Sequence, residues 1–408
     1  MDRRLLTRVV LRNYKSIAAC DVAPEQLSFL VGPNGSGKSN FLDALRFIAD
    51  SLQFSLDHAL RDRGGIHEVR RRSGGHPTHF GIRVEFSLAD SFGHYAFRVG
   101  ARAGGGYEVQ EEECHVVQRG RPLFQGGGRN DHSYRVERGC VTESTISPPP
   151  AAAADRLYLV NVSGVGAFRP VYDALSGTGF YNLNPEAIRD LQQTDPGELL
   201  KRDGSNSASV LSNLGSRSSD FKKRIEAYLG KVVPGVAGVD RRTVGPRETL
   251  EFRQMVRGAQ HPWRFFASNM SDGTLRAFGV LLALFQAAGN SESHRRLVGI
   301  EEPEVALHPA AAGVLIDSLR DAAEHAQILV TSHSPDLLDN EEITADSIFA
   351  VVARHGESHI GPLDETGRAV LRDHLYTAGE LLRMGQLAPD PKLANVSPKQ
   401  IELFGRGP

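Results

Sequence analysis

Residues 32–39 read Gly32-Pro33-Asn34-Gly35-Ser36-Gly37-Lys38-Ser39 and satisfy the pattern G-x-x-x-x-G-K-[ST]. The apolar stretch LSFLVG ends at Gly32, and SNFLDALRFIADSLQ begins at Ser39 with apolar residues at helical spacing. A glycine loop between a strand and a helix is typical of a phosphate-binding loop, whose backbone N–H groups surround a β-phosphate. In such a loop Lys38 reaches the β- and γ-phosphate oxygens, the Ser39 hydroxyl binds Mg²⁺, and the helix N-terminus adds partial positive charge. A fortuitous glycine-rich turn would not need both flanking elements.

The overall composition excludes several classes of protein. The chain of 408 residues is long enough for two domains or for one domain with an insertion, and its net charge of −2 provides no global basic field for nucleic acid. The three cysteines, Cys20, Cys114 and Cys140, share no metal-ligand spacing and fit a reducing compartment. The N-terminus is too charged for a signal peptide, and no apolar run approaches the length of a membrane span. We therefore expect a cytoplasmic protein without a membrane partner.

Sequence patterns divide the chain into four segments. We expect an N-terminal lobe over 1–102, an insertion over 103–265, a C-terminal lobe over 266–355 and a tail over 356–408. Helical and strand patterns alternate in the C-terminal lobe, as in α/β layers. In the N-terminal lobe, FGIRVEFSL and YAFRVGAR predict an antiparallel pair of strands. These patterns predict an α/β fold with a mixed or parallel sheet and an antiparallel β lobe.

The insertion carries no recognisable motif. Residues 103–155 are rich in Gly, Pro and charge, and we expect irregular loops there. The stretch RLYLVNV (156–162) predicts a strand, whereas NPEAIRDLQ (184–192) and SDFKKRIEAYLG (219–230) predict helices. No heptad repeat persists, which excludes a long coiled coil. In the tail we expect one helix over 367–385.

Two glutamates, Glu301 and Glu302, directly follow the apolar stretch RLVGI. An acid at the carboxyl end of a parallel strand can reach the Mg²⁺ shell of a neighbouring phosphate loop, so Glu301 is the expected metal-side acid. The next side chain faces another way and can deprotonate an attacking water, which makes Glu302 the expected catalytic base. The alternative is a surface turn with two solvated carboxylates.

A histidine, His333, follows the next apolar stretch, QILVT. It lies one βαβ step beyond the glutamates, and we expect it to donate a hydrogen bond to a γ-phosphate. A single histidine after a strand is more often incidental. Here the prediction rests on the position of His333 relative to the two glutamates.

A cluster of small polar residues within SNMSDGTLR (268–276) precedes the apolar run AFGVLLALFQAA. Ser271 is placed to cap the helix that begins here. Capping by Ser271 does not explain why Gly273 follows Asp272. A residue with a higher helix propensity would serve equally well in a helix that is only capped.

These pieces together resemble the ABC-type ATPase heads of the SMC, RecF and OLD group. LRNYKSI is similar to the N-terminal strand and turn of that group, and GPNGSGKSN, with Asn40, is similar to its Walker A loop. SDGTLR is similar to its signature motif, GIEEPE to Walker B and TSHSP to the H-loop. The five elements occur in family order.

The resemblance implies a P-loop NTPase of ABC-ATPase type, which binds ATP with Mg²⁺ and hydrolyses it as an ATP-dependent homodimer. In such a dimer the signature helix caps the γ-phosphate held by the other subunit. The implied nucleotide contacts are Gly32, Pro33, Asn34, Gly35, Ser36, Gly37, Lys38, Ser39, Asn40, Ser271, Asp272 and Gly273. The implied catalytic residues are Glu302, His333 and Lys38, and the implied Mg²⁺ ligands are Ser39 and Glu301.

Two features depart from the family pattern. The metal-side acid is usually Asp, whereas here it is Glu301, as in OLD-like relatives. No convincing Q-loop glutamine follows the first helix, where residues 59–80 read ALRDRGGIHEVRRRSGGHPTHF.

Two functions remain open. The 75 residues after His333 contain no acidic cluster suited to two-metal cleavage, so the chain looks like a head without its own nuclease. It could be an ATP-switched dimer that binds DNA, in DNA repair, genome maintenance or phage defence. Alternatively, it could be an ATPase scaffold that holds a separately encoded effector, such as a Toprim-like nuclease or a toxin.

Two basic clusters are candidate contacts to DNA phosphates. They are Arg70-Arg71-Arg72, beside Gly74-Gly75, and Lys222-Lys223-Arg224. The alternative for each is a solvated basic face.

Overall fold

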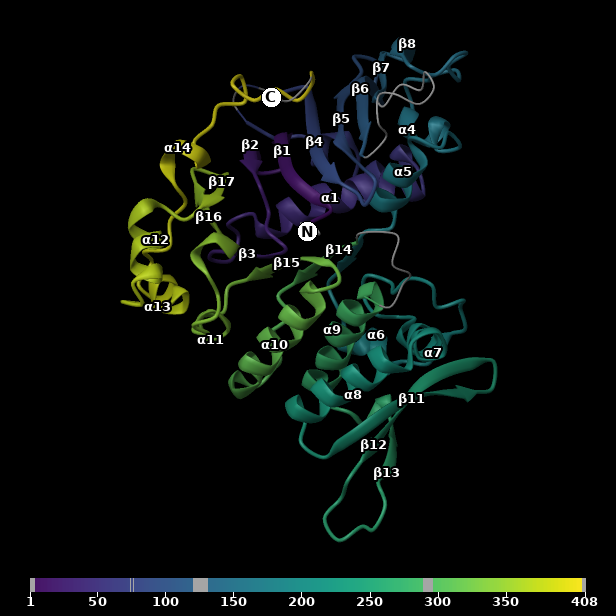
Figure 1. The fold of residues 1–408 in the computed structure, drawn as a ribbon, viewed down its shortest axis with the longest axis vertical. Coiled ribbons are helices and arrows are strands. Elements are labelled where there is room, and N and C mark those ends of the chain that lie inside the picture. The colour runs from purple at the N-terminus through teal and green to yellow at the C-terminus, as the bar shows by residue number, and fades with distance from the viewer. Residues whose placement is uncertain (1–3, 74, 76, 120–130, 289–295, 406–408) are drawn as a thin grey trace.

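The computed structural model describes residues 4–73, 75, 77–119, 131–288 and 296–405. Three sheets organise them. In Figure 1 a large antiparallel sheet lies at the top, a mostly parallel sheet crosses the middle, and a small antiparallel sheet lies at the bottom. This arrangement confirms the predicted α/β class with an antiparallel β lobe.

The central sheet has six strands in the order β17-β16-β3-β15-β14-β9. Five of them run parallel, and β17 pairs antiparallel with β16. Parallel strands end at one edge of a sheet, and here Val31 pairs with Ser332 while Glu301 pairs with Thr331. The predicted motifs therefore leave the sheet at the same edge. The strands are β3 (Leu27–Val31), β9 (Gly179–Tyr181), β14 (Leu297–Glu301), β15 (Gln327–Ser332), β16 (Ile348–Arg354) and β17 (Glu357–Pro362).

Alternate residues of the central strands enter two separate cores. Leu30 and Leu329 pack with α1 and the large antiparallel sheet, whereas Phe29 and Val330 pack with α9 and α10. Strands that are buried on both faces are apolar throughout, which is why their sequence pattern is so clear. The three helices are α1 (Lys38–Gln53), α9 (Asp272–Ala288) and α10 (Ala312–Ala323).

The large antiparallel sheet has seven strands in the order β2-β1-β4-β5-β6-β7-β8. The predicted pair of strands within residues 80–102 is confirmed, since β4 pairs with β5. The other five strands extend this pair on both sides. The strands are β1 (Leu6–Tyr14), β2 (Ile17–Val22), β4 (His79–Ser87), β5 (Ser91–Ala101), β6 (Tyr107–Gln118), β7 (Asp131–Glu137) and β8 (Cys140–Ser144).

The expectation of irregular loops over 103–155 is wrong for much of the described part of that range, which forms β6, β7 and β8. Two of the charged residues that suggested loops, Glu111 and Glu113, lie on the face of the sheet opposite to the buried Glu112. Glu111 is paired there with Arg98, at 3.0 Å, and with Arg135. Because cross-strand ion pairs satisfy these charges, a strand can carry them without alternating apolar residues.

The expectation of a strand over 156–162 is also wrong, because this stretch forms the short helix α4 (Tyr158–Val162). Its first N–H groups are held by a distant carboxylate: Glu112 of β6 accepts from the N–H groups of Tyr158 (2.5 Å) and Leu159 (2.8 Å). The hydroxyls of Tyr134 (2.8 Å) and Tyr95 (3.2 Å) also donate to Glu112. Burial raises the pKa of this carboxyl to about 7, against the four donors, which favour the ionised form.

Replacing Glu112 by leucine should lower the free energy of unfolding by at least about 4 kcal/mol. The substitution leaves two backbone N–H groups and two hydroxyls without an acceptor in the core, and each such group costs about 1–3 kcal/mol. Urea denaturation followed by tryptophan fluorescence and circular dichroism measures the change. Glu112→Gln is the control, since its amide oxygen still accepts, and it should lose less than half as much. Equal stability of Glu112→Leu and the native protein would contradict this account.

The small sheet and its helices form the part of the chain at the bottom of Figure 1. β12 pairs with β11 on one side and with β10 and β13 on the other. The predicted helices are present, but the long hairpin of β11 and β12 was not predicted. The elements are α6 (Pro185–Arg189), β10 (Gln192–Gln193), α7 (Ser207–Arg217), α8 (Ser219–Val232), β11 (Val236–Val244), β12 (Arg247–Gln254) and β13 (Trp263–Phe266).

Within the tail, two helices, α12 (Glu365–Arg372) and α13 (Ala378–Arg383), occupy the range 367–385 in which a single helix was expected. Thr377 interrupts the expected helix because its side chain accepts from the N–H of Glu380, whose carboxylate accepts in turn from the N–H of Thr377. This capping box starts a new helix. The remaining helices are α2 (Leu56–Arg61), α3 (Ile66–Val69), α5 (Arg169–Ser176), η1 (Ala267–Asn269), η2 (Pro309–Ala311), α11 (Pro335–Leu338), η3 (Ala345–Ser347) and α14 (Pro391–Ala394).

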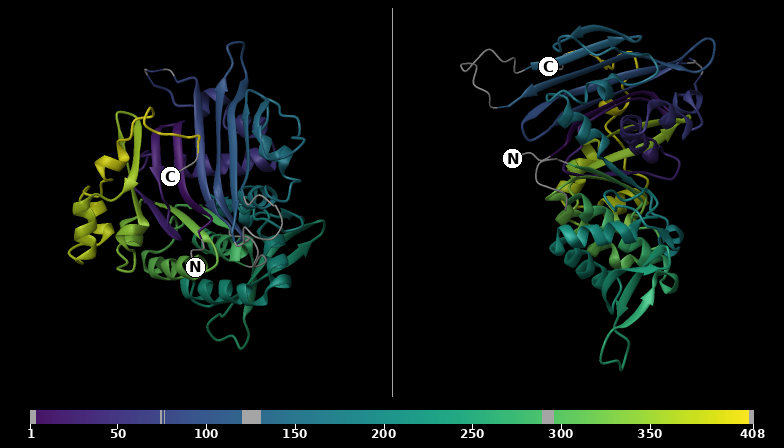
Figure 2. Two further views of the ribbon diagram at one scale, coloured as in Figure 1. Left: turned by 45° about the horizontal axis from the view of Figure 1, so that its top comes forward. Right: turned by 90° about the vertical axis from the view of Figure 1, so that its right-hand side faces the viewer.

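The end of the described chain returns to the large antiparallel sheet, as the yellow trace in Figure 2 shows. Arg83 of β4 donates to the carbonyl oxygens of Leu403 (3.1 Å) and Gly405 (3.0 Å). The N–H of Gly405 donates to Glu113 of β6 at 2.8 Å. The tail therefore stabilises the face of the sheet that α1 does not cover.

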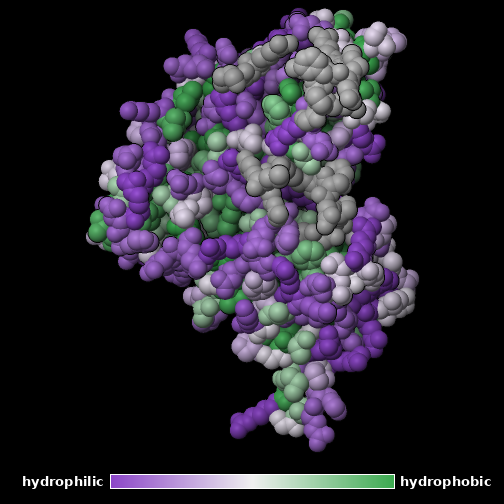
Figure 3. Space-filling view, in the orientation of Figure 1, coloured by the Kyte–Doolittle hydropathy of each residue, from purple (hydrophilic) through white to green (hydrophobic). Residues whose placement is uncertain are grey.

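Among the described residues, no helix combines the length and the apolar character needed to cross a bilayer. Hydrophilic residues cover most of the face shown in Figure 3, and hydrophobic residues are scattered across it.

Candidate nucleotide-binding site

The glycine loop joins β3 to α1, as predicted. Gly35 (φ 76°) and Gly37 (φ 105°) adopt left-handed backbone conformations, which glycine tolerates best. A Cβ atom on Gly37 would lie 2.0 Å from the Ser358 hydroxyl oxygen, and one on Gly32 would lie 2.0 Å from the Val351 carbonyl oxygen. Conformation and space therefore both require glycine in this loop.

Lys38 lies inside the loop with only 4 % of its surface exposed. Its ammonium donates to the carbonyl oxygens of Gly32 (2.8 Å) and Pro33 (3.1 Å). Burial lowers the pKa of Lys38, and the negative charges of Glu302 and Glu304 oppose this effect. The buried hydroxyl of Ser36 has no hydrogen-bond partner. A buried cation beside an unpartnered hydroxyl in a loop of backbone N–H groups fits a phosphate group.

Ser39 and Glu301 line the same pocket, of about 220 Å³. The structure thus brings together the two predicted Mg²⁺ ligands, one from the start of α1 and one from the end of β14. A hydroxyl and a carboxylate are the oxygen ligands that Mg²⁺ prefers beside phosphates. Lys15, Asp43 and Arg202 line the pocket as well.

Glu302, the expected base, does not line the pocket that contains Glu301. Its backbone is left-handed (φ 45°), and its N–H donates to the Thr331 carbonyl oxygen at 3.0 Å. The Glu302 Oε1 atom lies 3.0 Å from Nδ1 of His333. A strained backbone at a residue other than glycine is a feature of functional sites, where the surrounding structure holds it. Here it brings the expected base and the expected H-loop histidine together.

Glu304 is a site residue that sequence reasoning missed. Its carboxyl is largely buried and accepts from the Ser332 hydroxyl at 2.6 Å, while its second oxygen has no partner. Burial raises the pKa of Glu304. The sequence contained a signal for Glu304, since it is the third acid of GIEEPE and lies two residues after Glu302. Its negative charge, like that of Glu302, acts on the ammonium of Lys38.

The signature residues form a capped helix start. The Ser271 hydroxyl accepts from the N–H of Thr274 at 3.3 Å and lies 2.9 Å from the Thr274 hydroxyl. Asp272 is ion-paired with Arg189 of α6. A Cβ atom on Gly273 would lie 2.5 Å from the Ala306 carbonyl oxygen, so close packing also requires this glycine. None of these signature residues lines the pocket of Ser39 and Glu301.

A buried arginine connects the signature helix with the two glutamates. Arg276 is 8 % exposed and donates to the carbonyl oxygens of Glu302 (2.9 Å) and Glu301 (3.3 Å). It also donates to the Leu183 carbonyl oxygen at 2.6 Å. The sequence signal for this residue was an arginine directly before the apolar run AFGVLLALF of α9.

The turn between β1 and β2 also borders the site. The Asn40 amide donates to the Ser16 hydroxyl at 2.7 Å, which fixes the start of α1 against this turn. Lys15 of the turn is ion-paired with Asp43 at 2.6 Å, and Arg63 binds the same carboxylate at 3.0 Å. Burial alone would raise the pKa of Asp43, but Arg63 and Lys15 lower it.

Charged residues that follow α1 contribute to the pocket of Ser39 and Glu301. Asp62 and Arg63 line the pocket, whereas residues 54–80 contain no glutamine. The Q-loop position is therefore not filled by the usual residue type.

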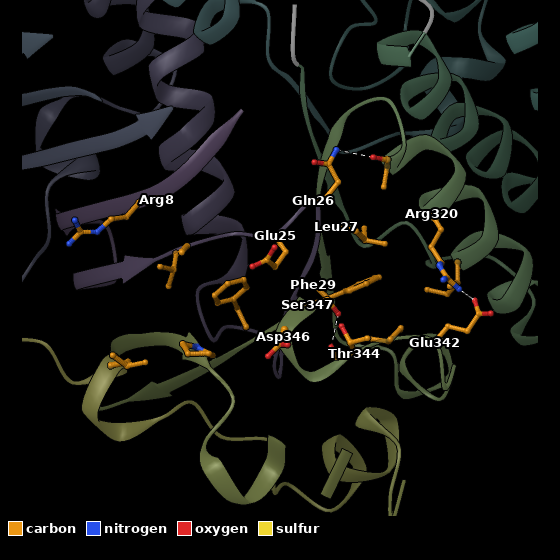
Figure 4. Close-up of a pocket in the computed structure, with 18 of the residues that line it drawn as sticks. Arg8, Glu25, Gln26, Leu27, Phe29, Arg320, Glu342, Thr344, Asp346 and Ser347 are labelled. Atoms are coloured by element: carbon orange, nitrogen blue, oxygen red, sulfur yellow. Dashed lines mark hydrogen bonds and ion pairs between the residues drawn. The ribbon is translucent and has the colours of Figure 1, made fainter. Parts of the chain in front are cut away.

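A second pocket, of about 990 Å³, lies at the opposite ends of the central strands (Figure 4). Leu27 and Phe29 at the start of β3 lie on its wall, whereas the phosphate loop leaves the other end of that strand. Arg320 in this wall is ion-paired with Glu342, and Arg8 with Asp21 at 2.6 Å. This pocket lacks a phosphate-binding loop among its described walls and is not the nucleotide site.

Most cations of the two basic clusters are already paired within the chain. Arg71 binds Glu357 at 2.7 Å, and Arg72 binds Glu68. Arg224 is paired with Asp321. Lys222 binds Asp240 (2.8 Å) and Glu226 (3.1 Å), and exposed Lys223 lies 3.5 Å from Asp220. Gly74 of the first cluster lies outside the described residues.

Comparison with known proteins agrees with these motifs. The profile of a family described as "AAA domain, putative AbiEii toxin, Type IV TA system" matches residues 27–104 and 152–339. The DNA replication and repair protein RecF of Vibrio vulnificus is 38 % identical over 50 residues, which cover 12 % of this chain and only 14 % of RecF. The structural maintenance of chromosomes protein 4 of Dictyostelium discoideum is 49 % identical over 49 residues, which cover 11 % of this chain and 4 % of that protein.

Solved structures show the same fold. An Smc head bound to the C-winged helix domain of ScpA has a TM-score of 0.55 at 13 % identity, covering 89 % of this chain and 99 % of that one. An Smc head domain bound to the C-terminal domain of ScpA from Pyrococcus furiosus has a TM-score of 0.52 at 12 % identity, covering 91 % and 99 %. Because the family profile matches more than half of the chain, the protein belongs to this AAA-domain family and is an ABC-type P-loop ATPase of the SMC/RecF group.

Proposed function

We propose that this protein hydrolyses ATP and closes on it as a homodimer, so that ATP acts as a conformational switch. The observation that carries the proposal is the separation of two groups of residues. Ser39 and Glu301 line one pocket at an edge of the central sheet, beside the loop that holds Lys38, whereas Ser271 of the signature motif lies outside that pocket. An exposed, capped helix start of this kind fits the nucleotide of a second copy, which gives a two-fold sandwich.

The chain's own residues can perform the hydrolysis. Lys38 and the loop N–H groups would hold the phosphates, and Ser39 with Glu301 would hold Mg²⁺. When bound, Mg²⁺ would offset phosphate charge. Glu302 would accept a proton from the attacking water, and the neighbouring His333 would orient that carboxylate and donate to the γ-phosphate.

Replacing Ser271 by arginine should prevent ATP-dependent dimerisation while leaving ATP binding by the monomer unchanged. The arginine places a bulky cation where the partner's phosphate loop would approach. Light scattering with ATP and Mg²⁺ measures the mass, and fluorescence of a labelled ATP analogue measures binding. Ser271→Thr is the control, because its hydroxyl can still cap α9. If Ser271→Arg dimerises and hydrolyses ATP at the native rate, the signature motif is only a helix cap.

Two cellular roles are candidates for this ATP-dependent switch. The names of the relatives favour DNA repair or genome maintenance. The pairing of Arg71, Arg224 and Lys222 with carboxylates of the same chain favours the second candidate, a scaffold for a separately encoded effector, including one in phage defence. The ATPase rate with and without duplex DNA separates them: stimulation that depends on salt supports DNA binding, and an unchanged rate supports the scaffold.

A further inference from the structure

The segment 199–206 brings a cation from the insertion to the nucleotide pocket. Its backbone is fixed at two places. The Arg202 carbonyl oxygen accepts from the N–H of Asn182, just after β9, at 3.0 Å. The N–H of Leu200 donates to the side chain of Gln286 on α9 at 3.1 Å. The segment is therefore attached both to the central sheet and to the signature helix.

The Arg202 side chain binds the expected metal-side acid. Its Nη2 atom lies 2.8 Å from Oε1 of Glu301, and both side chains line the pocket that contains Ser39. The Glu301 side chain is 18 % exposed and that of Arg202 is 46 % exposed, so the guanidinium is free to leave. A carboxylate oxygen that accepts from a guanidinium is less available to a cation, and the two positive charges repel each other.

The neighbouring segment also holds the signature motif. Arg189 of α6 donates to the Met270 carbonyl oxygen at 3.2 Å and is ion-paired with Asp272. Leu183 accepts from Arg276 of α9. Residues 182–206 thus contact both the metal-side acid and the entrance of the signature helix.

We propose that Arg202 is a positioning residue that competes with Mg²⁺ for Glu301, so that metal binding breaks this ion pair and loosens the 199–206 segment, which its backbone hydrogen bonds still hold. The proposal rests on the nucleotide site described under the proposed function. It assigns a role to the insertion, which has no motif of its own: the insertion reports occupancy of the metal position to the segment that holds Asp272.

Arg202→Gln should lower the Mg²⁺ concentration that gives half-maximal enhancement of ATP binding. The expected decrease is about two- to five-fold, the range for an ion pair with one partly exposed partner. Fluorescence of a labelled ATP analogue, titrated with MgCl₂, measures this midpoint. The backbone bonds of the segment do not use the Arg202 side chain, so the variant should fold normally.

Lys201→Gln is the matched control. It removes the same charge one residue away, from a half-exposed side chain whose carboxylate partner, Asp195, is 3.8 Å distant. If the loss of one positive charge near the pocket were enough, both variants would shift the Mg²⁺ midpoint. Competition at Glu301 predicts a shifted midpoint in Arg202→Gln alone. Equal shifts in the two variants, or an unchanged or higher midpoint in Arg202→Gln, would overturn the proposal.

Hydrogen exchange gives a readout that does not depend on turnover. In the native protein, ATP with Mg²⁺ should increase amide exchange in 199–206 relative to ATP with EDTA, and Arg202→Gln should abolish that difference. Unchanged exchange in the native protein contradicts the loosening of the segment. A native protein that binds no ATP in either condition overturns the proposed function together with this inference. A native protein that binds ATP, with a variant that keeps the native midpoint, overturns the inference alone.

Discussion

ATP binding should be lost when Lys38 is replaced by alanine. The buried ammonium is the cation that the loop offers to the phosphates, and a hydrogen bond to a charged group is worth about 1.5–3 kcal/mol. Two such bonds correspond to roughly 10²- to 10⁴-fold in affinity. Titration calorimetry with ATP and Mg²⁺ measures the loss.

The burial of Lys38 determines the control for this experiment. The side chain is only 4 % exposed, and its ammonium is bonded to the carbonyl oxygens of Gly32 and Pro33. Alanine therefore removes support for the loop as well as charge. Lys38→Met keeps most of the side-chain volume and removes the ammonium group with its charge and its two hydrogen bonds, and it should bind ATP as poorly as Lys38→Ala. Native affinity in Lys38→Met, with an unchanged melting temperature, would refute the assignment of the phosphate loop.

The parts of the fold that could be predicted are those whose signal is local. β3, β14 and β15 are buried on both faces, so their apolar runs are continuous, and each ends at a motif. The glycine loop needs left-handed residues at fixed positions, which the sequence displays directly. The edge of the sheet where Ser39 and Glu301 meet followed from parallel topology alone.

The parts that could not be predicted depend on distant partners. β6 carries Glu111, Glu112 and Glu113 in succession, and only its neighbours in the sheet show why each is tolerated. Glu112 accepts from the start of α4, which reads as a strand in isolation because of its apolar residues. Local pattern reports which residues are apolar, whereas long-range hydrogen bonds decide whether a charged stretch is a strand or a loop.

The same distinction applies within the site. The cap at Ser271 was predicted from spacing along one helix. Arg276 and Arg202 were not predicted, because both contact Glu301 across a long stretch of sequence, 25 residues for Arg276 and 99 residues for Arg202. Both arginines were visible in the sequence, but their partners are defined only by the fold. The division of the chain into four segments stays a prediction.

Replacing Glu302 by glutamine should slow ATP hydrolysis by about 10²- to 10⁴-fold without loss of ATP binding. Glutamine keeps the size of the side chain and the 3.0 Å contact with His333, but it cannot accept the proton of the attacking water. Binding should persist because Lys38, Ser39 and the loop N–H groups carry it. Single-turnover hydrolysis and nucleotide binding, measured on the same preparation, separate the two effects.

The same substitution should trap the dimer, since ATP that is not hydrolysed stabilises the state that binds it best. Glu301→Gln is the matched comparison one residue away. It weakens the expected Mg²⁺ site and should therefore lower the affinity for ATP with Mg²⁺, so that less dimer forms. Light scattering with ATP and Mg²⁺ distinguishes a Glu302→Gln dimer from a Glu301→Gln monomer. If Glu302→Gln remains monomeric with ATP bound, the sandwich is wrong, and if it hydrolyses ATP at the native rate, Glu302 is not the base.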